Sequence, residues 1–169
     1  DPLAPHAEPL RPDDVDLRGL VERGWLRNLP QPLLDEAPRI AAASPIERAA
    51  LGYLHGNCGH CHADPAATTA AVPVGIVLAQ DVLSPAATAK VMRSLLDAPS
   101  RFVPSGRTTA APVVAPGDSS NSVLPLRMRS RNPQVQMPPL GTAITDSAAL
   151  ALIERWIDHD LPSIQEHQP

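Results

Sequence analysis

Apolar residues recur at helical spacing in several stretches of this chain, so the pattern predicts an all-α protein. The expected helices lie at 13–23, 45–56 and 85–97, within 119–130, and at 146–158. A short extended piece is expected at 74–78. The chain contains 21 prolines in 169 residues, and because proline restricts the backbone, the connections should be loop-rich and stiff.

Polar residues mark the expected start and end of the first helix. Asp13 or Asp14 is expected to cap it, Leu17 and Leu20 share a face, and Gly24 should end it. The stretch 25–44 that follows is broken by prolines and is interpreted as a connector.

The next helix has a stronger start signal. Ser44-Pro45-Ile46-Glu47 combines an N-cap serine, a proline at the first helical position and a capping-box glutamate. Ser84-Pro85 repeats the cap and the proline before the third helix. The last helix should bury one stripe of side chains: Ala149, Leu152, Ile153, Trp156 and Ile157.

The only two cysteines of the chain lie in Cys58-Gly59-His60-Cys61-His62, just after the expected 45–56 helix. A C-x-x-C-H run is the attachment site of c-type haem. The two thiols add across the vinyl groups of one porphyrin edge, and the next histidine then reaches one face of the iron. The motif therefore predicts haem c on Cys58 and Cys61, with His62 as an iron ligand.

Two other uses of these residues are weighed against haem. A thioredoxin-like dithiol needs no histidine after the second cysteine and usually lies at a βα junction, which this segment lacks. A zinc site could use His55, His60 and His62, but a structural zinc site normally has a second ligand pair at similar spacing.

Three methionines are candidates for the opposite face of the iron. Met92 lies in a run with the helical apolar spacing of a core residue, and Met128 lies in an expected short helix. Met137 precedes Pro138 and Pro139, which exclude a helix and stiffen the loop. A rigid loop suits an electron carrier, because the iron geometry then changes little between oxidation states. Met137 is the expected sixth ligand; the alternative is a methionine that fills a gap under the loop.

With these motifs the chain resembles a class I cytochrome c, and more narrowly the haem-c domains of secreted bacterial proteins. The resemblance covers about half of the chain, chiefly 45–64 and 112–160. It rests on Tyr53-Leu54-His55-Gly56-Asn57-Cys58, on Pro116-Gly117-Asp118 with Ser122-Val123-Leu124, and on Met137-Pro138-Pro139-Leu140-Gly141-Thr142.

The resemblance implies a cytochrome c-like helical fold around one covalent haem, with His62 and Met137 as iron ligands. The implied organisation is an N-terminal extension or tether with a short helix at 1–44, a cytochrome domain at 45–160, and a flexible tail at 161–169. A loop-rich insertion at 63–111 interrupts the domain.

The resemblance also implies further residues around the haem. Class I cytochromes commonly orient the haem histidine with a proline carbonyl, and Pro73, 11 residues after His62, is expected to accept from its Nδ1. The alternative is a proline that only stiffens its loop. In this family the last helix crosses the haem helix, which implies that Trp156 packs near Gly52 or Tyr53.

The low aromatic content fits a core that is filled by a cofactor. Aromatic residues make up only 2% of the chain, and a buried porphyrin would supply apolar surface at about 25 cal/mol per Å².

Positive charge is concentrated in one stretch of the chain. Residues 88–131 hold seven Lys and Arg against two Asp, a net charge of +5. Arg127 in this stretch is expected to pair with the haem propionates; the alternative is a solvated surface. No stretch of this sequence combines aromatic with basic residues in the way that indicates nucleic-acid binding.

The expected function is outer-sphere electron transfer with a redox partner protein, such as a dehydrogenase, an oxidase or another cytochrome. The expected location is periplasmic, because haem c is generally attached outside the cytoplasmic membrane. No apolar run approaches the roughly 20 residues of a membrane span. Two alternatives stay open: a haem enzyme or gas or peroxide sensor with an open distal site, and a cytochrome module of a larger oxidoreductase.

Overall fold

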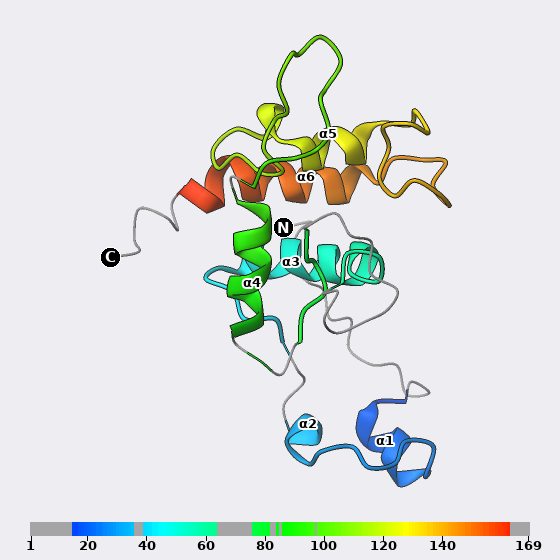
Figure 1. Ribbon diagram of the computed structural model, residues 1–169. Coiled ribbons are helices and arrows are strands. Elements are labelled where there is room, and N and C mark those ends of the chain that lie inside the picture. The colour runs from blue at the N-terminus through cyan, green and yellow to red at the C-terminus, as the bar shows by residue number, and fades with distance from the viewer. Residues whose placement is uncertain are drawn as a thin grey trace. The chain divides into compact units, whose positions relative to one another are not determined.

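The computed structural model describes residues 15–35, 39–63, 76–81, 84, 86–96 and 98–162. Within these ranges the chain is helical and contains no β-strand (Figure 1). Isolated bridges join residue 96 to 114 and residue 99 to 112. The prediction of an all-α chain is confirmed for these residues.

The helices follow one another as α1 (Leu17–Glu22), α2 (Pro32–Asp35), α3 (Pro45–Cys58), α4 (Ala86–Leu95), the 3-10 turn η1 (Ser119–Asn121), α5 (Val123–Arg129), α6 (Ser147–Arg155) and the π-helical turn η2 (Trp156–Asp160). The chain divides into two compact units, Asp1–Arg39 and Ile40–Pro169. This boundary lies five residues before the one expected between the extension and the domain.

The first helix of the N-terminal unit is capped by a different aspartate from those expected. The carboxylate of Asp16 accepts a hydrogen bond from the backbone N–H of Gly19 at 2.7 Å, whereas Asp13 and Asp14 lie outside the described residues. Gly24 follows the helix with a φ of 69°, a left-handed conformation that favours glycine and ends a helix.

The pattern did not predict α2, which lies in the proline-broken connector. The guanidinium of Arg18 donates to the backbone carbonyl of Leu34 at 3.1 Å and lies 3.8 Å from the carboxylate of Asp35. These contacts join α2 to α1. The helix has only four residues, and it occurs together with these tertiary interactions.

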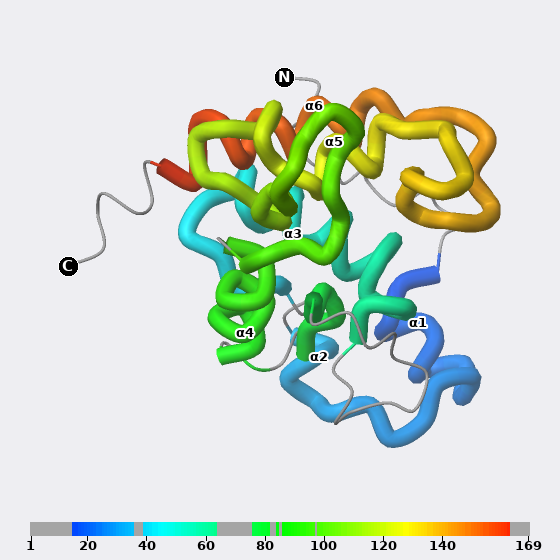
Figure 2. The backbone as a smooth tube through the Cα atoms, turned by 45° about the horizontal axis from the view of Figure 1, so that its top comes forward, coloured from blue at the N-terminus to red at the C-terminus, as the bar shows by residue number. Residues whose placement is uncertain are grey.

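The core of the second unit forms where α6 packs against both α3 and α5 (Figure 1 and Figure 2). Helix α3 begins as predicted: the hydroxyl of Ser44 accepts from the N–H of Glu47 at 2.9 Å, and Pro45 occupies the first turn. The Glu47 carboxylate reaches back to the N–H of Ala43 at 2.9 Å. The helix continues two residues beyond the expected end at 56 and finishes at Cys58.

The largest buried side chains come from α3, from the C-terminal helical segment and from α4. They are Leu51, Leu54, Leu95, Ile153, Trp156, Ile157 and Leu161. Ala149 is also buried, as the sequence pattern predicts, but Leu152 lies at the margin of the core. Leu161 is fully buried. The folded helical segment therefore reaches into the range 161–169, where the sequence predicted a flexible tail.

Part of the 63–111 insertion belongs to the core, whereas residues 105–110 are exposed. Helix α4 lies within it, and its side chains Val91 and Leu95 are fully buried. The N–H of Val114 donates to the carbonyl of Leu95 at 3.2 Å, which joins the end of α4 to the chain that leads into α5. This stretch therefore contributes buried side chains to the core of the domain as well as connecting its helices.

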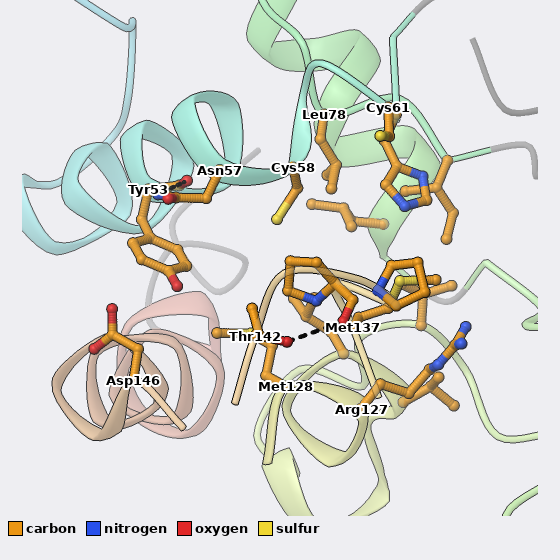
Figure 3. A pocket seen from close by; sticks show the side chains of 18 of the residues that line it. Tyr53, Asn57, Cys58, Cys61, Leu78, Arg127, Met128, Met137, Thr142 and Asp146 are labelled. Carbon is orange, nitrogen blue, oxygen red and sulfur yellow. Dashed lines mark hydrogen bonds between the residues drawn. The ribbon is translucent and has the colours of Figure 1, made fainter. Parts of the chain in front are cut away.

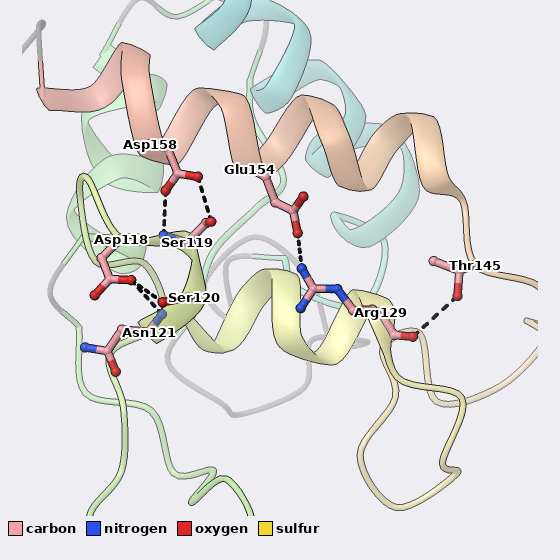
Figure 4. Close-up of polar contacts among 8 residues, drawn as sticks. All are labelled: Asp118, Ser119, Ser120, Asn121, Arg129, Thr145, Glu154 and Asp158. Carbon is pink, nitrogen blue, oxygen red and sulfur yellow. Dashed lines mark hydrogen bonds and ion pairs between the residues drawn. The ribbon is translucent and has the colours of Figure 1, made fainter.

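The turn before α5 is fastened to η2 by Asp158 (Figure 4). Its carboxylate accepts from both the backbone N–H and the hydroxyl of Ser119, each at 2.7 Å. The N–H of Gly117, whose φ is 79°, donates to the carbonyl of Ile157 at 2.8 Å. The same carboxyl-terminal segment thus supports α3 on one side and the approach to α5 on the other.

Asp158→Ala is expected to lower the free energy of unfolding by about 1–3 kcal/mol, because the half-buried Ser119 loses both acceptors. Urea denaturation measures the loss. Glu154→Ala is the matched control, since its ion pair with the exposed Arg129 also joins this region to α5 but should contribute less than about 1 kcal/mol. Equal losses in the two variants would contradict the structural role of Asp158.

Candidate functional site

A cavity of about 260 Å³ opens between the end of α3, the segment 76–78, α5 and the loop that follows α5 (Figure 3). Most of its wall is apolar. Six of the wall residues are Ile76, Leu78, Leu95, Val113, Val123 and Leu124. A cavity with this lining can hold a large apolar group, with polar interactions confined to a few positions.

The Cys-Gly-His-Cys-His motif lies on the wall of this cavity. The N–H groups of Cys61 and His62 donate to the carbonyl of Cys58 at 3.1 and 2.9 Å, so the chain folds tightly after α3. Both cysteines are free thiols; Cys58 is half-buried and Cys61 is exposed. Burial, and then the nearby Cys61, raise the pKa of Cys58 to about 11.

Gly59 allows the chain downstream to pass close to the motif. A Cβ at this position would lie 2.5 Å from the carbonyl oxygen of His55 and 3.0 Å from the Cα of Ala79. The carbonyl of His62 accepts from the N–H groups of Leu78 at 2.7 Å and Ala79 at 3.2 Å. The sequence gives no sign of this contact, which needs a glycine between the cysteines.

The Nδ1 atom of His62 is buried and makes no hydrogen bond to the described residues. Burial lowers the pKa of this imidazole; the carbonyl of Ile76 opposes the shift without meeting Nδ1 in hydrogen-bond geometry, and Arg127 and His60 add to the lowering. His62 is therefore neutral near pH 7, which is the form that binds a metal. Pro73, the expected acceptor, lies outside the described residues.

Two of the three methionines reach the cavity. Met92 packs against the core and does not line the wall, as predicted. Met128 of α5 and Met137 of the following loop both line it, and Figure 3 shows them across the cavity from Cys58 and Cys61. The fold thus brings a methionine from a distant part of the chain opposite the cysteines.

Arg127 places a cation on the wall and also supports the approach to Met137. Its Nε donates to the carbonyl of Val135 at 2.7 Å, and its own carbonyl accepts from the N–H of Met137 at 3.0 Å. The guanidinium lies 5.2 Å from the ring centroid of Phe102. Burial lowers the pKa of Arg127, but an arginine stays protonated in proteins.

Tyr53 lines the cavity and points toward Asp146 (Figure 3). Burial, and then the negative charge of Asp146, raise the pKa of Tyr53. Trp156, in contrast, is fully buried in the helical core and is not part of the wall. A Cβ on Gly52 would meet nothing within 4 Å, but η2, which begins at Trp156, contacts α3, and Tyr53 packs against the core cluster that contains Trp156. The packing of Trp156 near Gly52 or Tyr53 stays a prediction.

The histidines proposed as zinc ligands are not gathered at one point. His55 accepts from the N–H of Gln80 at 3.0 Å through its Nδ1 and does not line the cavity. No group of three or more His, Cys, Asp or Glu side chains in the described part of the chain is placed to hold a metal ion.

The sequence also left a cavity residue unnoticed. Asp146 lines the wall beside the expected ligands, yet a lone aspartate carries no motif of its own. Thr142, the last residue of the motif that begins at Met137, lines the wall as well, although the motif assigned it no role. Of the basic stretch 88–131, the structure brings Arg127 and Arg131 to the wall.

Comparison with known proteins adds no relative: no family model, curated protein or solved structure matches this chain. Across the ranges that the structure describes, no helix has the length and apolarity needed to cross a membrane.

Proposed function

We propose that this chain is a mono-haem c-type cytochrome that transfers electrons, with haem bound covalently to Cys58 and Cys61 and ligated by His62 and Met137. One observation carries the proposal. Both thiols, the histidine of the motif and a methionine 75 residues after that histidine line the same mostly apolar cavity.

The residues of the cavity fit such a group. Two thiols lie in the spacing that haem attachment uses, a neutral imidazole follows them, and a soft thioether lies opposite. The Nδ1 of His62 is buried and has no hydrogen-bond partner among the described residues, which leaves the ring a second nitrogen to be oriented by a hydrogen bond. Arg127 supports the proposal as a cation on the cavity wall, because a guanidinium pairs well with an anionic substituent such as a propionate.

Bound haem would supply a one-electron couple between ferrous and ferric iron. The chain would set the properties of that couple. The Met137 thioether favours the reduced state, and the apolar wall disfavours the additional charge of the oxidised state, so both raise the potential. The proposed partners are redox proteins outside the cytoplasmic membrane, because haem c is generally attached there.

Absorption spectra of the purified protein in both oxidation states test this function. We expect the bands of haem c, and in the ferric protein the weak far-red band of methionine bound to iron. Carbon monoxide should bind the reduced protein slowly, because it must first displace Met137. A colourless protein would end the haem proposal. Rapid carbon monoxide binding would favour an open-site enzyme or sensor over a carrier.

A further inference from the structure

We propose that Arg131 and Thr142 are positioning residues that hold the Met137 loop, defined as residues 137–145, against α5 and so fix Met137 at the cavity wall. This inference rests on the proposed function, because the position of Met137 matters most if it is an iron ligand.

The hydroxyl of Thr142 uses its full hydrogen-bonding capacity. It donates to the carbonyl of Pro138 at 3.2 Å. It accepts from Nη1 of Arg131 at 3.1 Å and from Nε2 of Gln136 at 3.4 Å. One donor and two acceptor positions are all that a hydroxyl offers. Because Gln136 and Pro138 flank Met137, this single group restrains the chain on both sides of the methionine.

Arg131 joins that hydroxyl to α5. Its Nη2 donates to the carbonyl of Met128 in the last turn of the helix, and its Nε donates to the hydroxyl of Thr145 at 3.0 Å. The three donors reach three acceptors, one on α5 and two in the Met137 loop, which the planar fork of a guanidinium allows and a lysine ammonium does not reproduce. One half-buried side chain thus connects the helix end to two threonines of the loop.

The Met137 loop has few other means of attachment. Pro138 and Pro139 supply no amide donors. Apart from Met137, the large apolar side chains of the loop are mostly exposed: Leu140 is 83% exposed, and Ile144, at the edge of the cavity, is 85% exposed. Apolar burial therefore contributes little at these positions.

The loop is also held by the Met137 N–H, which donates to the carbonyl of Arg127 at 3.0 Å, and by the Thr145 hydroxyl, which donates to the carbonyl of Arg129 at 3.4 Å. The contacts of Thr142 and Arg131 supply the attachment between these two points.

Gln136 completes the arrangement from inside the fold. Its side chain is only 7% exposed, and its Nε2 also donates to the carbonyl of Pro139 at 3.3 Å. Loss of the Thr142 hydroxyl would leave Gln136 and Arg131 each without one acceptor. Since unpaired polar groups that are shielded from water cost free energy, the loop should then open more often.

The test compares Thr142→Val, which removes the hydroxyl at nearly constant volume, with Thr142→Ser, which keeps it. Both are made in the full-length protein with its haem. We expect amide hydrogen exchange at Met137 to become about tenfold faster in Thr142→Val and the far-red band to weaken. Thr142→Ser should match the wild type in both measurements.

A second pair of variants tests whether the position of the arginine matters or only its positive charge. Arg131→Gln should accelerate exchange at Met137 as Thr142→Val does. Arg129→Gln removes the same charge two residues earlier, where the side chain is exposed and pairs with Glu154, and it should leave exchange at Met137 unchanged. Exchange at the core residue Leu54 monitors global stability and should stay constant in all four variants.

The proposal is overturned if Thr142→Val and Thr142→Ser behave alike, or if exchange at Leu54 accelerates as much as at Met137. Failure of the proposed function gives a different result. A protein without haem, or a far-red band that survives replacement of Met137, rejects the ligand assignment. The exchange comparison still decides whether the two residues hold the loop.

Discussion

Replacing both Cys58 and Cys61 with alanine is expected to abolish covalent attachment of haem. The wild-type polypeptide should keep its colour through acid–organic extraction and should exceed the mass of the chain by one haem. The double variant should lose the colour and show the mass of the bare chain, because no other cysteine is present to form a thioether. Each single variant should keep one thioether and a less stable holoprotein.

His62→Ala gives the matched control for this result. The carbonyl of residue 62 still accepts from Leu78 and Ala79, so the turn that presents the cysteines should persist. Haem that this variant attaches should therefore resist extraction while its spectrum changes, but the holoprotein should be less stable than either single cysteine variant, because the proximal iron ligand is lost. Extraction-resistant haem in the double cysteine variant, or a wild type that binds none, would contradict attachment through these thiols.

Met137→Leu is expected to abolish the far-red band and to lower the midpoint potential by on the order of 100 mV, because a soft thioether ligand is lost. Leucine keeps nearly the same volume, so packing should change by less than about 1.5 kcal/mol. Optical titration of the haem against redox dyes measures the potential. Carbon monoxide should bind the reduced variant rapidly, since the distal face is then open.

Met128→Leu is the matched control, because Met128 lines the same cavity from α5. This variant should retain the far-red band and a potential close to that of the wild type. Loss of the band in Met128→Leu with retention in Met137→Leu would move the ligand from the loop to the helix.

The sequence predicted features of the fold whose causes are local. The start of α3 was predicted because Ser44, Pro45 and Glu47 act within one helical turn. Helix α2 was missed because its interactions with Arg18 involve residues far apart in sequence. The core position of Met92 in α4 was predicted from its local spacing, but the pairing of Leu95 with Val114 was missed, since nothing near Leu95 indicates it.

The same difference between local and long-range causes applies to the site. The motif from Cys58 to His62 predicted the chemistry, because its spacing is itself the signal. The amphipathic stripe correctly predicted that Trp156 is buried, but a stripe cannot specify what the side chain touches. The contacts of Thr142 depend on how the loop folds back toward α5, and no short pattern records them. The cytochrome fold and its haem stay predictions.

The two spacer residues between the cysteines are not equivalent for protein engineering. Gly59 is buried and has the backbone of Ala79 3.0 Å from its missing Cβ, so any side chain there would push the neighbouring segment away. His60 is exposed at the rim of the cavity. A linker to an electrode, or a dye that reports electron transfer, therefore belongs at position 60, where it would lie beside the porphyrin edge without disturbing the fold.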